Sequence, residues 1–423
     1  MEVGPRKEFA FRLFLLGALF LLAQSPLRAQ DRQIAKTVRE LHAIPSAEPV
    51  SAEVPPPVRS LLKRLKSELR ELITAVLNKQ PTATLEALRE SLMAEMRAAG
   101  LDPEASGEAS GDSTQADEGY GDLEEVTVRR PPPHRNLLAV VITLQVPCGN
   151  DASLYLFELR GASWKLVLAD EANGYDTVAG AQGNFQYAVS PPDADGSWFV
   201  VAGNVGPWCS SNWRDFRYHV LRPGDSPDHP QTLRAEQRDI YLGTGESFKL
   251  SVSRKGFQIS QFGSQSLDPG ILMRVHIQKY TVSGNRVSRV FPLALLPQDF
   301  LDEWVELPWE EASRWAASTD PSALQEWQSR LQHNHSGGAK FTTVLDFVQP
   351  CPTTGDIPTW QIGLLIKARG HAELPADFPE ELFLTVAQRA GDFSVAAVGA
   401  ERPAGCPGES KPVETGESRE LPE

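Results

Sequence analysis

The chain has 423 residues, with 41 Lys and Arg against 55 Asp and Glu, and a formal net charge of −14. Affinity for nucleic acid comes largely from Lys and Arg that displace counterions from phosphates. The acidic balance therefore argues against nucleic acid and anionic membrane surfaces as partners. The length allows more than one domain.

The N-terminus has the pattern of a secretory signal. Three basic residues lie within Met1–Arg12, the apolar run Leu13–Ala23 has 11 residues, and small Ala29 follows. Residues 1–29 are predicted to be a signal peptide cleaved after Ala29. The run is shorter than the roughly 20 residues of a spanning helix, so we expect no membrane insertion after cleavage. The predicted location is secreted or periplasmic.

Residues 30–101 are predicted to be a helical segment. Apolar residues between Val58 and Val76 recur at spacings of three and four, which is typical of one helix face. A second helix is expected from Thr84 to Ala99, with Gly100 as its stop. We expect an antiparallel helix pair, and an alternative is that this hairpin docks or dimerises.

Residues 102–128 are predicted to be an acidic linker. From Asp102 to Glu125 the chain carries nine acidic residues and no Lys or Arg, mixed with Gly, Ser and Ala. Such a composition buries too little apolar surface to offset the entropy of ordering.

The largest predicted domain, 129–307, is an antiparallel β domain. Leu137–Val146 is nearly all apolar, as in a strand buried on both faces. Turn dipeptides such as Asn173-Gly174 separate about ten expected strands. The fold class is therefore mainly β, an antiparallel β-sandwich or meander, preceded by a helical hairpin and followed by a small α+β domain.

Three further segments complete the predicted organisation. Residues 308–337 form a short helical connection, with Asp320 as an N-cap before Pro321. Residues 338–406 form the small C-terminal β-rich α+β domain. The Pro, Gly, Glu and Ser composition of 407–423 predicts a disordered tail.

Four cysteines, an even number in an exported chain, predict disulfides. Pairing Cys148 with Cys209 and Cys351 with Cys406 closes each bridge within one predicted domain. No two cysteines are close in sequence, so we expect no zinc site.

Catalytic and cofactor motifs are missing from the sequence. It has no H-E-x-x-H, no G-x-S-x-G and no P-loop pattern, so no catalytic residue, cofactor or metal ligand is predicted. A surface site is instead expected around Asp193–Arg222. Its candidate binding residues are Trp208 and Trp213, beside Asp215 and Arg217.

The leading functional hypothesis is a secreted or periplasmic non-enzymatic protein that binds an extracellular or envelope polymer or protein. One alternative is a hydrolase of extracellular polymer that uses carboxylates near Asp302 and Glu303. The other alternative is a structural component of the envelope.

Overall fold

The structure is a computed structural model, which describes residues 26–44, 53–101, 119–207, 213–241, 248–264, 273–290, 292–318, 320–332, 341–352, 357–368, 374, 378–403 and 406. The chain divides into two compact units, Met1–Lys255 and Gly256–Glu423. Strands prevail in both, which confirms the predicted mainly β class. In the described residues no helix is long and apolar enough to cross a membrane.

In the described part of the first unit, three helices precede the sheets: α2 (Pro26–His42), α3 (Pro56–Lys79) and α4 (Leu85–Ala98). Pro residues occupy the first turn of α3, where their missing N–H is tolerated. The Thr84 side chain caps α4 by accepting a hydrogen bond from Ala87 N at 3.2 Å. The predicted apolar stripe of α3 is buried within the same chain, where it helps to form a core with sheet residues.

The first sheet has the order β1-β2-β3-β4, made by β1 (Leu123–Arg129), β2 (Leu137–Val146), β3 (Gly149–Arg160) and β4 (Ser163–Glu171). All neighbours are antiparallel. Strand β2 is buried on both faces, as predicted from its composition. One face packs on the helices through Leu138 and Val140, and the other contributes Leu137 and Ala139 to a second core.

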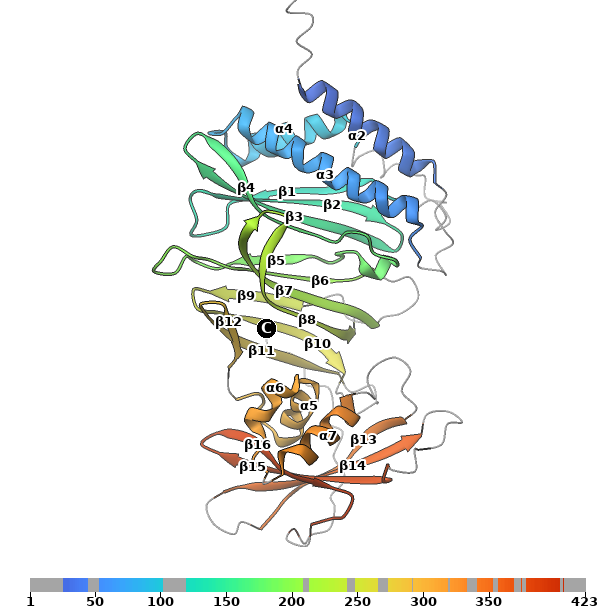
Figure 1. Ribbon diagram of the computed structural model, residues 1–423, viewed down its shortest axis with the longest axis vertical. Coiled ribbons are helices and arrows are strands. Elements are labelled where there is room, and N and C mark those ends of the chain that lie inside the picture. The colour runs from blue at the N-terminus through green and yellow to red at the C-terminus, as the bar shows by residue number, and fades with distance from the viewer. Residues whose placement is uncertain are drawn as a thin grey trace, which may run out of the picture. The chain divides into compact units, whose positions relative to one another are not determined.

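The second sheet has the order β5-β6-β7-β8, made by β5 (Gln186–Val189), β6 (Val200–Val205), β7 (Trp213–Ser226) and β8 (His229–Tyr241). The short 3-10 turn η2 (Val178–Gly180) precedes it. Residues of both sheets share the second core, including Leu154 from β3 and Val200 from β6. The first unit is therefore a β-sandwich with a layer of helices on one side (Figure 1).

A buried ion pair links the helical layer to the first sheet. Lys66 Nζ of α3 lies 2.7 Å from Asp151 Oδ2 of β3, and the two side chains are 1% and 0% exposed. Tyr175 donates its hydroxyl proton to the same carboxylate at 2.8 Å. Burial, and then the Asp151 charge, raise the pKa of Tyr175, which keeps that proton in place. Lys66 also donates to the carbonyl of Ala172.

The third sheet has the order β12-β11-β10-β9. Its strands are β9 (Phe248–Ser253), β10 (Gly256–Ser264), β11 (Met273–Ser283) and β12 (Arg286–Arg289). The boundary between the two units falls between β9 and β10. Strands β11 and β12 form a hairpin, in which Ser283 pairs with Arg286.

The rest of the second unit combines short helices with a fourth sheet. The helices are α5 (Pro297–Glu306), α6 (Trp309–Ala312), η3 (Ser313–Trp315) and α7 (Pro321–Gln332). The sheet has the order β13-β14-β15-β16, made by β13 (Phe341–Pro350), β14 (Thr359–Ala368), β15 (Glu381–Arg389) and β16 (Asp392–Gly399). One core joins helices and sheet, with Trp304 and Leu384 fully buried.

The predicted N-cap of α7 is present. The Asp320 carboxylate accepts hydrogen bonds from Ser322 N at 3.1 Å and Ala323 N at 3.3 Å. The backbone hydrogen bond from Ala323 is the main reason that the pKa of Asp320 is lowered.

Two element positions differ from the sequence analysis. Strand β1 lies partly within 102–128, which was assigned to the linker. Its charged residues resemble the composition of a linker, although Val126 and Val128 of this strand are buried. Helix α5 lies within 129–307, which was assigned to the β domain. Residues 102–118, the greater part of the predicted linker, lie outside the described residues.

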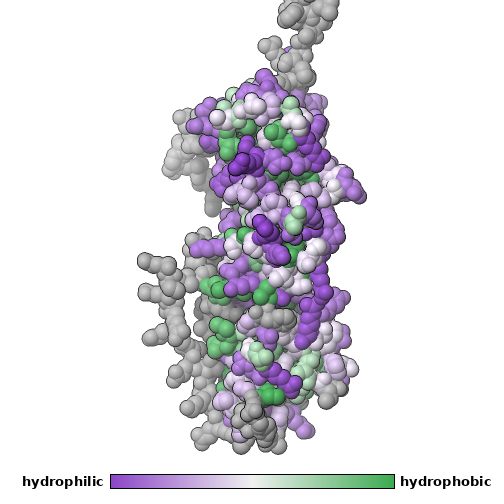
Figure 2. All heavy atoms as spheres, turned by 90° about the vertical axis from the view of Figure 1, so that its left-hand side faces the viewer, coloured by the Kyte–Doolittle hydropathy of each residue, from purple (hydrophilic) through white to green (hydrophobic). Residues whose placement is uncertain are grey.

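On the face that Figure 2 shows, hydrophobic residues lie in small patches among hydrophilic ones. Scattered apolar residues of this kind are normal on a protein surface.

Candidate ligand-binding cleft

The structure places only part of the predicted surface site. Trp208 lies outside the described residues, and so does the side chain of Trp213, the first residue of β7. Asp215 is half-buried and accepts a hydrogen bond from Gln237 Nε2 at 3.1 Å. The role of these residues in binding stays a prediction.

Arg217 shares one face of β7 with Asp215, and it binds backbone of the same chain. Its guanidinium donates to the carbonyls of Gly180, at 3.3 Å, and Ala179. Burial lowers the pKa of Arg217, while the carboxylates of Asp215 and Asp151 oppose that shift. These contacts hold the η2 turn against β7, which is a structural role.

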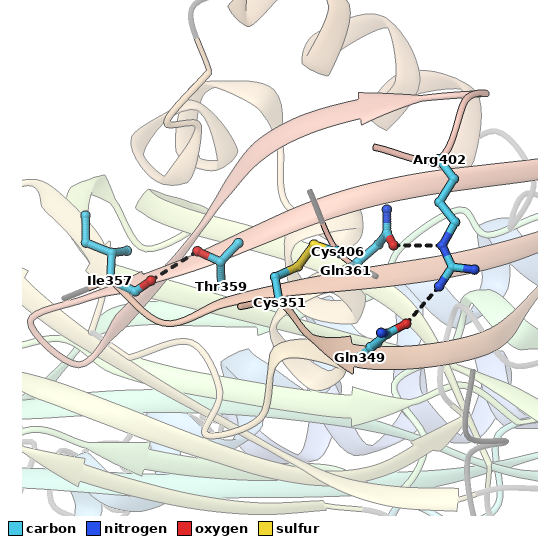
Figure 3. Close-up of a disulfide and its surroundings, with 7 residues drawn as sticks. All are labelled: Gln349, Cys351, Ile357, Thr359, Gln361, Arg402 and Cys406. Carbon is cyan, nitrogen blue, oxygen red and sulfur yellow. Dashed lines mark hydrogen bonds between the residues drawn. A yellow bond between two sulfur atoms is a disulfide. The ribbon is translucent and has the colours of Figure 1, made fainter. Parts of the chain in front are cut away.

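One predicted disulfide is present. Cys351 and Cys406 are bonded, with their Cα atoms 4.7 Å apart, and Arg402 nearby donates to Gln349 at 2.8 Å and Gln361 at 3.1 Å (Figure 3). Cys209 lies outside the described residues, so its pairing with Cys148 stays a prediction.

The carboxylates of the hydrolase alternative are buried. Asp302 and Glu303 on α5 are 2% and 4% exposed. Glu303 lies 3.0 Å from His276 Nδ1 and 3.3 Å from Arg289 Nη2. These contacts are typical of a group that fastens α5 to β11 and β12.

A cleft of about 690 Å³ lies within the first unit, at the edge of the sandwich. It opens where the core between the sheets ends, because Val141 and Ala152 belong both to that core and to the cleft. Its lining comes from both sheets and β9: Glu124, Glu125, Thr127, Arg129, Val141, Thr143, Asn150, Ala152, Asn184, Phe185, Gln186, Tyr187, Phe248 and Lys249.

The floor of the cleft is the outer part of the first sheet. Thr127 and Arg129 line it because alternate residues of β1 point to the same side, while Val126 and Val128 are buried on the other. The register shifts between Leu123 and Glu125, as in a β-bulge. A bulge breaks the alternation, which explains how the neighbours Glu124 and Glu125 both reach the cleft.

The opposite wall is mainly aromatic. Phe185 and Tyr187 stack with their ring centroids 6.3 Å apart and 28° between the ring planes. Both are half-buried because they pack on the core between the sheets. Phe248 of β9 also lines the cleft, but it is 3% exposed and packs against Phe216 with 4.7 Å between the ring centroids. Gln186 Nε2 donates to the carbonyl of Phe248 at 2.9 Å, which ties β5 to β9.

One lip of the cleft has an unusual backbone conformation. Asn184 has φ of 41°, in the left-handed region, where Asn is the best tolerated residue after Gly. The preceding Gly183 approaches β6 closely, because a Cβ there would lie 2.7 Å from the carbonyl oxygen of Val205. The turn is therefore fixed on β6, and Asn184 is exposed at the cleft. Strained residues of this kind are frequent at binding sites.

Charges of both signs line the cleft. The two negative charges of Glu124 and Glu125 are balanced by the two positive charges of Arg129 and Lys249. The Thr127 hydroxyl donates to Glu125 Oε1 at 2.9 Å, which orients that carboxylate. Burial raises the pKa of Tyr187, and the positive charge of Arg129 opposes part of the rise. Tyr187 therefore keeps a hydroxyl proton to donate at neutral pH.

Over the described ranges, no group of three or more His, Cys, Asp and Glu side chains is arranged to hold a metal ion. The cleft thus offers hydrogen bonds, aromatic faces and balanced charge.

The sequence analysis did not predict the cleft, because β1 was assigned to the linker. The sequence does contain one signal for the aromatic wall. Phe185 and Tyr187 are two residues apart, as on one face of a strand, and they follow the turn residues Gly183 and Asn184.

The sequence matches no model of a known protein family, and it matches no curated protein either. The functional argument therefore rests on the site.

Proposed function

We propose that this protein is an exported, non-enzymatic binding protein whose ligand enters the cleft between the two sheets of the first unit. The observation that carries the proposal is the cleft itself, about 690 Å³ with polar groups on one wall and aromatic rings on the other. Ligand sites commonly have volumes of about 300–1,000 Å³ and combine apolar surface with a few placed polar groups.

Two features support export. The chain begins with the signal pattern of residues 1–29, and it contains the Cys351–Cys406 disulfide. Disulfides persist mainly in oxidising compartments. The partner is accordingly an extracellular or envelope polymer or protein, or a fragment of one.

A pair of matched variants tests binding in the cleft. Thr127→Trp places a large side chain on the cleft floor, whereas Thr232→Trp makes the same change at an exposed position of β8 outside it. The probes are separate panels of oligosaccharides, peptides, nucleotides and fatty acids, with the thermal unfolding midpoint as the readout.

A ligand at 100 times its Kd stabilises the folded state by about 2.7 kcal/mol. We expect a panel member to raise the midpoint of the natural protein and of Thr232→Trp, and to leave Thr127→Trp unchanged. Equal shifts in all three proteins would place the ligand elsewhere. No shift with any panel would contradict the proposed function.

A further inference from the structure

We infer that the ligand of this cleft is a neutral carbohydrate, a chain of a few sugar rings. The inference rests on the proposed function, which it makes specific. Four independent features of the described residues lead to it: the aromatic wall, the planar hydrogen-bonding groups, the charge balance and the protected strand edges.

The aromatic wall offers flat faces of the size of a sugar ring. Phe185, just before β5, and Tyr187 on β5 lie side by side with 6.3 Å between their centroids, and the nearly buried Phe248 of β9 also lines the cleft. An aromatic face carries partial negative charge, which attracts the partly positive C–H groups on one side of a pyranose ring. The rings of Phe185 and Tyr187 are half-buried against the core, so their positions are set before a ligand arrives.

The polar groups of the cleft suit pairs of neighbouring hydroxyls. Asn150, Asn184 and Gln186 supply amides that both donate and accept, and Glu124 and Glu125 supply carboxylates that accept. A sugar diol needs a donor and an acceptor a short distance apart, and planar side chains present both. The bulge at Glu124 and the left-handed Asn184 direct these groups into the cleft from its two sides.

The charge balance favours a neutral ligand over an ionic one. Two carboxylates and two cationic side chains line the cleft, so the lining has no net charge to attract an anion or a cation. The net charge of the chain, −14, repels anionic polymers over a longer range. An anionic ligand would also face the two carboxylates of the lining, and a cationic ligand would face its two cationic side chains.

The strand edges at the cleft argue against a peptide. A peptide that adds to a sheet needs an accessible edge. The edge of β1 is charged and bulged, and Arg89 Nε donates to the carbonyl of Val126 at 3.3 Å, which occupies one backbone acceptor of this edge strand. These are devices that prevent strand addition. On the other side, β5 has only four residues and is tied to β9 through Gln186.

Calorimetric titration of the full mature chain tests the inference. The probes are neutral tetrasaccharides of glucose, mannose, xylose, galactose and N-acetylglucosamine, an oligogalacturonate as the charged sugar, and a pool of decapeptides. We expect one of the neutral tetrasaccharides to bind, with an affinity insensitive to salt. Tyr187→Ala should weaken that binding at least about tenfold, the change that 1.4 kcal/mol gives.

Asn184→Gly separates binding from folding. Gly adopts positive φ at little cost, so this variant should unfold at the same temperature as the natural protein or higher. It lacks the amide, so we expect weaker tetrasaccharide binding. Trp198→Ala is the control, since Trp198 packs on the same core without lining the cleft. It should lose stability and keep affinity.

The outcomes are distinct. Decapeptides that bind in place of sugars, and lose affinity in Thr127→Trp, would overturn the carbohydrate inference and leave the proposed function standing. If the oligogalacturonate binds more tightly than the neutral tetrasaccharides, and its affinity depends on salt, the inference that the ligand is neutral is wrong. If no sugar binds, the carbohydrate inference is wrong. If nothing in any panel binds the cleft, the proposed function fails as well.

Discussion

Asn78 pairs with both backbone groups of Trp164. Its amide donates to the Trp164 carbonyl at 3.0 Å, and its carbonyl oxygen accepts from Trp164 N at 2.7 Å. Trp164 lies on β4, an edge of the first sheet, and Asn78 belongs to the last turn of α3. At this residue one side chain therefore makes the two backbone hydrogen bonds that a neighbouring strand would make, which protects that point of the edge from pairing.

Asn78→Ala should lower the free energy of unfolding by about 1–3 kcal/mol, because it leaves backbone groups of a buried strand without partners. Asn78→Asp keeps the acceptor for Trp164 N but places a carboxylate oxygen against the carbonyl oxygens of Trp164 and Thr74, so it should also lower the free energy of unfolding. The control is Gln80→Ala, which removes only a 3.4 Å contact with Ser91. Urea unfolding measures all three. An Asn78→Ala protein as stable as Gln80→Ala would refute the pairing.

Lys66→Met should destabilise the first unit by about 3–5 kcal/mol, the usual effect of leaving one member of a buried ion pair alone. The reason is that the Asp151 carboxylate would stay buried with one positive partner removed. The double variant Lys66→Met with Asp151→Asn should regain much of the loss, because it removes both charges. Denaturant unfolding of the single and double variants gives the coupling energy. Additive losses would show that the pair contributes no interaction.

Replacing both Cys351 and Cys406 by Ala should destabilise the second unit by about 2–5 kcal/mol, as is usual when a native disulfide is lost. The bond closes a loop with a sequence separation of 55 residues. Hydrogen exchange should quicken in β13 to β16 and stay unchanged in β1 to β8. As a control, Arg402→Ala removes the hydrogen bonds beside the bridge and keeps the bridge. Faster exchange in the first unit would contradict this division.

The acid stability of the first unit should depend on Glu236. Burial alone would raise the pKa of this carboxyl, but Arg238 and Arg234 outweigh it and the pKa is lowered. A lowered folded-state pKa contributes stability that is present above the unfolded pKa, about 4.3, and is lost as pH falls through the folded value. Glu236→Gln should therefore be less stable at pH 7 and lose less stability below pH 4. Parallel stability curves would contradict this.

Elements with a strong local signal were predictable from the sequence. Asp320 before Pro321 defined the start of α7, and the apolar composition of Leu137–Val146 defined a strand buried on both faces. In each case neighbouring residues contain the physical cause, a cap for free N–H groups or apolar side chains on both faces.

The cleft was not predictable in this way, because its residues come together only through sheet register. Glu124 reaches it because β1 is bulged against β2, and Phe248 reaches it because β9 packs beside β5. Local sequence gives neither the bulge nor the partner of an edge strand. The tryptophans around Trp208 are conspicuous in the sequence, whereas the cleft lining is ordinary in composition.

Gly203 on β6 does not line the cleft, but it leaves room for the ring of Phe248, which does. A Cβ at this position would lie 2.8 Å from Phe248 Cε2, too close for the ring to stay in place, and Phe216 lies 3.4 Å away on another side. The ring of Phe248 would have to shift, and with it the wall that it forms. A position that no ligand contacts can therefore affect which ligands fit. Gly203→Ala would change the shape of the cleft, although every residue that lines it would stay the same.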